Sequence, residues 1–175
     1  VFKKYNIRPL FFINSDFLDL NDKDAFQYCR EHIGTWEERG LSTEQLYRLQ
    51  EIGCIMGGHS HFHTDLTDSN LKMDDKCKRV SGDKAQLSMK LGCEVEGFAY
   101  PYGRYNDEAI EVIRESGYSY GFTSDSGFLH ADQLPYRIKR TNVGMRHYPI
   151  VFAYIEGWSE KITQITGVLK GFLGK

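Results

Sequence analysis

The segment Cys54-Ile55-Met56-Gly57-Gly58-His59-Ser60-His61-Phe62-His63 joins a short apolar run to two glycines and three histidines. The apolar run predicts a minimal strand, so the histidines are expected on the loop at its carboxyl end. In an extended segment all three rings would share one face, whereas in a helical turn only His59 and His63 would do so. Either geometry can hold a divalent metal ion through neutral imidazole nitrogens, and the alternative is a polar loop of solvated histidines.

The sequence on both sides of this segment alternates between strand and helix patterns. Short β-branched and aromatic runs predict strands at residues 7–13, 95–100, 118–123 and 136–143. Apolar residues at helical spacing predict helices at residues 42–53, 73–91, 106–117 and 159–172. A helix is also expected after the first strand, although residues 22–32 are too polar to decide its limits.

Capping residues mark the ends of several of these helices. Ser42, with Gln45 three residues later, predicts a capped start, and Gly53 predicts the end of the same helix. Asn106 is a second predicted N-cap. Gly82 weakens the middle of the long helix at residues 73–91.

The order of elements is typical of an α/β fold with a largely parallel sheet. Parallel strands present their carboxyl ends on one side, and chemistry gathers on the loops that follow them. Those loops are expected at residues 14–16, 59–65, 102–105 and 124–126. A length of 175 residues predicts one domain, spanning 1–175.

Composition excludes several classes of protein. The chain has 22 Lys and Arg against 24 Asp and Glu, a net charge of −2, which argues against nucleic acid as the main partner. Leu10-Phe11-Phe12-Ile13 is far shorter than the roughly 20 apolar residues that span a bilayer. No leader sequence is recognised at Val1, and the compartment and oligomeric state stay open. The four cysteines form no CxxC pair and are expected to be buried thiols rather than disulfides: Cys29, Cys54, Cys77 and Cys93.

Two histidines do not complete a metal site. A catalytic zinc ion usually takes three protein ligands and a water, so a third ligand, expected to be a carboxylate, must come from elsewhere. Asp65 is the nearest carboxylate, but it is expected to hydrogen-bond within its own loop. Asp74 and Asp75 lie on a charged helical face that is expected to be solvated.

Two motifs resemble those of one known family. His59-Ser60-x-x-His63-x-x-Leu66 resembles the second motif of the polysaccharide deacetylases, also called the NodB-homology domain or carbohydrate esterase family 4. Phe98-Ala99-Tyr100-Pro101-Tyr102-Gly103 resembles the third motif in the form seen in biofilm-polysaccharide deacetylases. Residues 3–12 and 41–53 resemble the strand and helix that lead into the histidines, and the likeness extends over roughly residues 1–143.

The resemblance implies a distorted (β/α) barrel that removes acetyl groups from an N-acetylated glycan with a divalent metal ion such as zinc. His59 and His63 match the metal ligands, and a carboxylate base would accept the proton of the attacking water. Tyr102 matches the residue whose backbone N–H faces the developing oxyanion. Pro101 fixes the entry into that loop, and Asp125 falls near a residue that lines the substrate groove.

The chain departs from the family pattern at its first motif. That motif, an aspartate pair on the first strand, supplies the base and the third metal ligand, and nothing in residues 1–175 resembles it. We therefore expect a barrel without its first strand, belonging either to a longer active enzyme or to a product that lacks the motif. The general-acid histidine of the fifth motif has no convincing match, since His130 and His147 are both expected at the surface.

Two other functions remain open. A sugar-binding protein of the same fold could keep an aromatic groove around Tyr100, Tyr102 and Tyr105 without catalysis. A strand-borne His59-x-His61 pair could instead belong to an amidohydrolase-type metal hydrolase, which needs further ligands on later strands. Neither the identity of the glycan nor that of the metal follows from the sequence.

Overall fold

The computed structural model describes residues 3–34, 39–130 and 133–142. The helix expected at 159–172, His147, and Val143 at the end of the last expected strand lie outside these residues.

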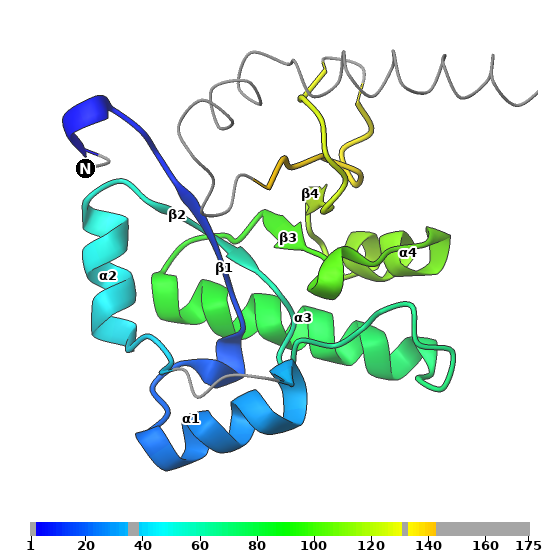
Figure 1. The fold of residues 1–175 in the computed structure, drawn as a ribbon, viewed down its shortest axis with the longest axis horizontal. Coiled ribbons are helices and arrows are strands. Elements are labelled where there is room, and N and C mark those ends of the chain that lie inside the picture. Colours follow the sequence, from blue (N-terminus) through cyan, green and yellow to red (C-terminus); the bar gives the residue numbers. More distant parts are fainter. Residues whose placement is uncertain (1–2, 35–38, 131–132, 143–175) are drawn as a thin grey trace, which may run out of the picture.

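Four strands form one parallel sheet: β1 (Leu10–Ile13), β2 (Ile55–Gly58), β3 (Gly97–Ala99) and β4 (Tyr120–Phe122) (Figure 1). Their spatial order is the sequence order, β1-β2-β3-β4. Ile13 pairs with Gly58, Gly58 with Phe98, and Phe98 with Gly121, so the carboxyl ends of the strands lie along one edge. In the described residues this sheet is an open arc of the expected α/β barrel.

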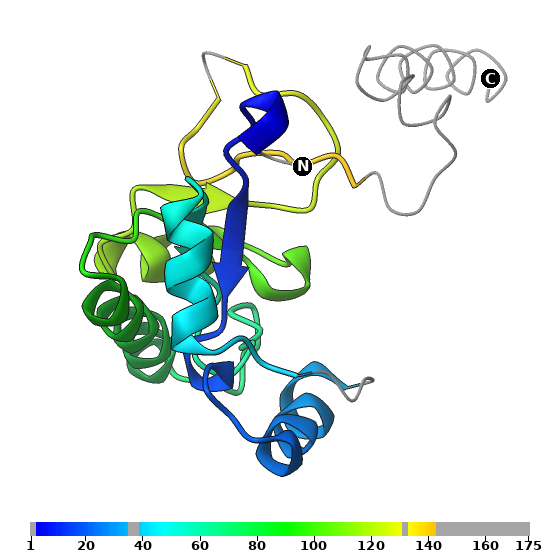
Figure 2. The same cartoon turned by 90° about the vertical axis from the view of Figure 1, so that its left-hand side faces the viewer.

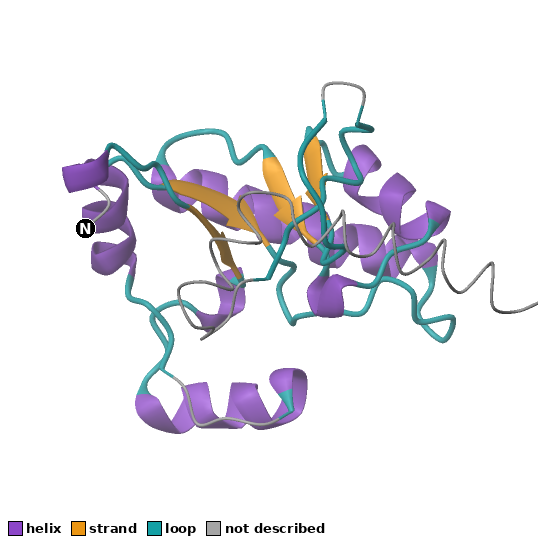
Figure 3. Ribbon diagram, turned by 45° about the horizontal axis from the view of Figure 1, so that its top comes forward, coloured by secondary structure: helices purple, strands orange, loops and turns teal. Residues whose placement is uncertain are grey.

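Three helices cover the sheet: α2 (Thr43–Glu51), α3 (Met73–Leu91) and α4 (Asp107–Glu115). α3 contacts both α2 and α4 and packs against β2, while α1 (Asp22–Tyr28) lies apart from this layer (Figures 1 and 2). The connections include two 3₁₀ turns, η2 (Ser15–Phe17) and η4 (Pro101–Gly103), and a π-helical turn, η3 (Cys29–Ile33), that directly follows α1. Figure 3 shows the helices and strands of the described residues by colour.

The hydrophobic core lies between the sheet and this helix layer. Each large apolar side chain that is fully buried there contributes about 1.5–3 kcal/mol relative to an exposed one. Its fully buried members include residues from all three helices and from β3, among them Leu46, Val80, Leu87, Phe98, Val112 and Ile113.

The predicted caps are confirmed. The Ser42 hydroxyl accepts the N–H of Gln45, and the Gln45 side chain accepts the N–H of Ser42, which completes a capping box. The Asn106 side chain accepts the N–H of Ala109 at 2.8 Å. Gly92 ends α3 in the left-handed conformation, with φ 66°.

The helix expected after the first strand is present and now has defined limits, whereas the last expected strand differs from the expectation. Residues 22–28 form a regular helix because Asn21 caps them and Ala25 and Tyr28 are buried. The strand expected at 136–143 is reduced, within residues 133–142, to a single bridge between Phe122 and Ile138. Pro135 lacks the N–H that a ladder needs, and the Arg137 N–H bonds within a turn to Leu134, so pairing cannot extend toward the amino end.

The cysteines agree with the expectation in part. No disulfide joins the four, all of which lie in described residues, and Cys29 and Cys54 are buried. Cys93 is exposed, contrary to the prediction, because it directly follows Gly92 at the end of α3. Among the described helices, none combines the length and apolarity that crossing a membrane requires.

Candidate active site

The loops at the carboxyl ends of β1, β2 and β3 meet, as the parallel sheet predicts. The Asn14 amide, just after β1, donates to the backbone carbonyls of His59 at 2.8 Å and Ser60 at 2.9 Å. The imidazole of His59 in turn contacts the carbonyl of Ala99 at the end of β3. Three consecutive strands therefore hold the histidine loop.

His59 is partly buried and fixed in one tautomer. Its Nδ1 lies 2.6 Å from the Ala99 carbonyl oxygen, which can only accept, so Nδ1 carries the proton and Nε2 keeps its lone pair. Burial lowers the pKa of His59 to about 4, although the bond to Ala99 opposes this shift. His59 is thus neutral near pH 7 and has the protonation state of a metal ligand.

His63 lies beside His59. The two ring centroids are 4.8 Å apart, with the planes inclined by 70°. The Nδ1 atom of His63 is buried and has no hydrogen-bond partner, and burial lowers the pKa of this histidine as well. A buried nitrogen without a partner is costly unless something absent from the polypeptide binds it, so the pair fits a metal ion.

His61 points away from this pair. Its Nδ1 lies 2.7 Å from the Ser15 hydroxyl and 3.1 Å from a carboxylate oxygen of Asp16. Positive φ angles at Ser60 and His63 turn the chain between the histidines. The segment is therefore neither the extended strand nor the helical turn that the spacing suggested, although the rings of His59 and His63 are neighbours, as the helical turn would have placed them.

Tyr102 stands next to His63. Its ring centroid is 4.4 Å from that of His63, and its hydroxyl donates to the His32 carbonyl at 3.0 Å. The backbone of Tyr102 has a φ of 59°, following the buried Pro101 at the start of η4. A Cβ at Gly103 would lie 2.3 Å from the Ser124 hydroxyl, so glycine allows this loop to approach the β4 loop closely.

The carboxylates predicted near the site have other partners. Asp125 accepts the Tyr105 hydroxyl at 2.7 Å. Asp65 accepts the N–H and hydroxyl of Thr67 in its own loop, as predicted, and pairs with Arg104 at 2.7 Å. Within the described part of the chain, no three His, Cys, Asp or Glu side chains form a cluster that could hold a metal.

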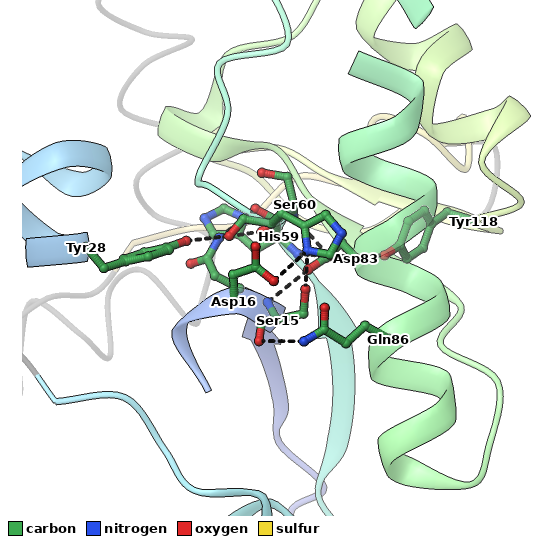
Figure 4. Close-up of polar contacts among 10 residues, drawn as sticks. Ser15, Asp16, Tyr28, His59, Ser60, Asp83, Gln86 and Tyr118 are labelled. Carbon is green, nitrogen blue, oxygen red and sulfur yellow. Dashed lines mark hydrogen bonds and ion pairs between the residues drawn. The ribbon is translucent and has the colours of Figure 1, made fainter. Parts of the chain in front are cut away.

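Asp83 is a site residue that sequence reasoning missed. It lies on α3, is fully buried, and accepts the backbone N–H groups of Ser15, His59 and Ser60 (Figure 4). The only signal in the sequence was Gly82 inside a helical pattern, which can indicate close approach of another segment.

Arg140 is a second residue that the sequence did not indicate. Its Nε donates to the Thr123 carbonyl at 2.8 Å, and its guanidinium lies 5.1 Å from the Phe12 ring centroid. The positive charge of Arg140 also helps to lower the pKa of His59, after the larger effects of burial and of His63. A partly buried cation therefore lies close enough to His59 to affect its charge state.

Comparison with known proteins decides the family. The model of the polysaccharide deacetylase family matches residues 1–121. The chain belongs to the polysaccharide deacetylase family. This polysaccharide deacetylase domain is 26% identical over 117 residues to a protein named polysaccharide deacetylase YxkH of Bacillus subtilis, covering 66% of this chain and 41% of that protein.

A second relative has a more specific name. The chain is 26% identical over 140 residues to the poly-β-1,6-N-acetyl-D-glucosamine N-deacetylase of Staphylococcus epidermidis, covering 74% of this chain and 48% of that one. The chain thus spans just under half the length of these two curated relatives.

Solved structures support the fold. IcaB from Ammonifex degensii superposes with a TM-score of 0.68 at 23% identity, covering 87% of this chain and 64% of that chain. A de-N-acetylase from Aggregatibacter actinomycetemcomitans gives a TM-score of 0.69 at 14% identity, over 87% and 67%. The predicted polysaccharide-deacetylase type of (β/α) fold is therefore confirmed.

Proposed function

We propose that this protein is a metal-dependent hydrolase that removes N-acetyl groups from an N-acetylated polysaccharide or oligosaccharide. The observation that carries the proposal is the pair His59 and His63, neutral and adjacent at the carboxyl end of β2, with a buried His63 nitrogen that lacks a partner. Family membership supports the reaction class.

His59 and His63 would hold the metal ion, which we propose to be zinc because imidazole nitrogens suit it. A divalent ion at this position supplies Lewis-acid chemistry, polarising the acetyl carbonyl and favouring deprotonation of the attacking water. These two residues are two of the three protein ligands that a catalytic zinc site usually has.

The Tyr102 loop would stabilise the reaction's developing negative charge. We assign this role to the backbone N–H of Tyr102, since Tyr102 lies in η4, on the loop that follows β3, and its ring touches His63. Pro101 would fix the entry of the chain into this loop. Asp125, which accepts a hydrogen bond from the Tyr105 hydroxyl, would contribute to the substrate-binding surface beside the Tyr102 loop.

The proposed substrate is an uncharged N-acetylated sugar polymer. One relative is named for poly-β-1,6-N-acetyl-D-glucosamine, and we propose a glycan of this chemistry for the present protein. A net charge of −2 suits a neutral ligand better than a polyanion.

Zinc titration tests the metal site directly. The full-length protein that contains these residues is prepared as wild type, as His59→Ala and His63→Ala, and as the control His130→Ala. Each is titrated with zinc in competition with a chromogenic chelator. His130 is exposed, so His130→Ala also removes one imidazole but leaves the proposed site intact. We expect one zinc ion per chain, lost in the first two variants and kept in the control. Equal zinc binding by all four proteins would contradict the assignment of His59 and His63 as metal ligands.

Acetate release tests the reaction. The full-length protein that contains these residues is incubated with N-acetylglucosamine oligomers and zinc, and the acetate and free amines formed are measured. We expect activity that disappears in His59→Ala and His63→Ala. Binding of zinc and glycan without release of acetate would instead favour the non-catalytic sugar-binding alternative.

A further inference from the structure

The carboxylate of Asp83 reaches from α3 into the loops that follow β1 and β2 (Figure 4). One of its oxygens accepts the Ser15 N–H at 2.9 Å. The other accepts the N–H groups of His59 at 3.1 Å and Ser60 at 3.0 Å. A single buried side chain therefore satisfies three backbone donors from two strand ends.

Both carboxylate oxygens of Asp83 accept hydrogen bonds in this arrangement, so neither can carry a donor toward these N–H groups. The Tyr118 hydroxyl adds a fourth, longer contact to the same oxygen as His59, at 3.4 Å. An ionised carboxylate offers lone pairs on both oxygens, whereas an asparagine must present an NH₂ group to one side. Charge-assisted bonds of this kind are stronger than neutral ones.

Two glycines make the close approach possible. A Cβ at Gly58 would lie 2.0 Å from the Tyr118 hydroxyl and 2.7 Å from Asp83. A Cβ at Gly82 would lie 2.5 Å from Nε2 of His61. Both glycines therefore remove side-chain bulk where α3 meets the histidine loop.

Asp83 binds directly to the backbone of His59, which is a proposed metal ligand. The backbone N–H of His59 is held by Asp83, its carbonyl by Asn14 and its ring by the Ala99 carbonyl. The neighbouring Ser60 hydroxyl accepts the Thr64 N–H at 2.8 Å, which closes the turn that presents His63. With Asp83 removed, the amides of His59 and Ser60 lose their partner at the start of this turn.

We propose that Asp83 is a positioning residue that fixes the main chain of the metal-binding loop, so that His59 and His63 converge on one ion. This role rests on the proposed function. Asp83 does not touch the metal; it acts through the backbone of His59 and Ser60, as residues outside the ligand shell of a metal site commonly do.

The test compares Asp83→Ala and Asp83→Asn with Val80→Ala, a buried core variant on the same helix. All variants are made in the full-length protein that contains these residues; zinc affinity is measured by chelator competition, and amide hydrogen exchange is measured on the metal-free proteins. We expect Asp83→Ala to weaken zinc binding by about 10–100-fold. Asp83→Asn should lose less, because its amide oxygen can still accept from His59 and Ser60. Val80→Ala should keep the wild-type affinity.

Hydrogen exchange separates positioning from general loss of stability. In Asp83→Ala the amides of Ser15, His59 and Ser60 should exchange faster than in Val80→Ala, relative to the other amides of each protein. Wild-type zinc affinity in Asp83→Ala, or an equal loss in Val80→Ala, would overturn the positioning role. Failure of the wild-type protein to bind zinc would instead overturn the proposed function on which the role rests.

Discussion

The hydroxyl of Tyr28 donates a hydrogen bond of 2.5 Å to the main-chain carbonyl of His61. This bond ties the end of α1 to the histidine loop, and burial raises the pKa of Tyr28, so that the hydroxyl stays protonated. The ring of Tyr28 also stacks on Phe17, with centroids 4.9 Å apart. α1 is thus anchored to the candidate site although it lies apart from the other helices.

Tyr28→Phe removes this bond and keeps the ring packing. We expect a loss of about 1 kcal/mol in the free energy of unfolding, because the His61 carbonyl loses its partner. Tyr47→Phe, on the exposed side of α2, is the control and should change stability little. Urea denaturation of both variants measures the difference, and equal stabilities would show that the bond contributes nothing.

Gly82→Ala has two opposing effects on stability: a higher helix propensity and a steric clash with a neighbouring side chain. In the middle of a helix this change usually stabilises by roughly 0.5–1 kcal/mol. Here the added methyl group would meet His61 Nε2 at 2.5 Å, so we expect a net loss of stability instead. Ser81→Ala, on the exposed side of the same turn, should gain slightly. A gain from Gly82→Ala in thermal denaturation would contradict the proposed contact.

The strands and most helices could be predicted because their signals are local. Ser42 with Gln45 and the cap at Asn106 depend only on neighbouring residues, and the structure contains both. The helix at residues 22–28 was too polar for its limits to be decided, since its stability depends on burying Tyr28 against a distant loop. Propensity within a segment does not contain that information.

The candidate site could be predicted only where its residues are close in sequence. His59 and His63 stand four residues apart, so their spacing already indicated a shared face. Asp83 lies 24 residues after His59, in a helix with many charged residues. The neighbouring sequence therefore does not distinguish Asp83 from the solvent-exposed acidic residues of the same helix. Its role depends on how α3 packs on β2, which is a tertiary property.

Lys76 and Glu108 form an ion pair of 2.8 Å between α3 and α4, in which the lysine side chain is fully buried. Glu108→Gln leaves that ammonium without its counter-charge, and we expect a loss of about 1–3 kcal/mol in stability because the glutamate is partly exposed. The double variant Lys76→Met with Glu108→Gln removes both charges and should recover most of the loss. If the double variant is no more stable than Glu108→Gln in urea denaturation, the buried charge is not the cause.

Asp19 should make stability depend on pH at the acidic end. Hydrogen bonds from the Thr43 side chain and backbone, and then from Lys90, lower the pKa of this carboxyl to about 2. Because the folded pKa is below the unfolded value, the stabilisation is present above about pH 4 and is lost as the pH falls toward 2.

Asp19→Asn isolates that charge, since asparagine tolerates the positive φ of 60° at this position as well as aspartate does. We expect the variant to be less stable than wild type at pH 7 by under about 1 kcal/mol, because the ion pair with Lys90 is exposed to solvent. The difference should shrink below pH 4 and disappear near pH 2. Glu96→Gln, at an exposed glutamate in the loop before β3, is the control and should change stability little. Denaturation curves at pH 7, 4 and 2 measure both, and a difference that persists at pH 2 would show that the bonds of Asp19 do not depend on its charge.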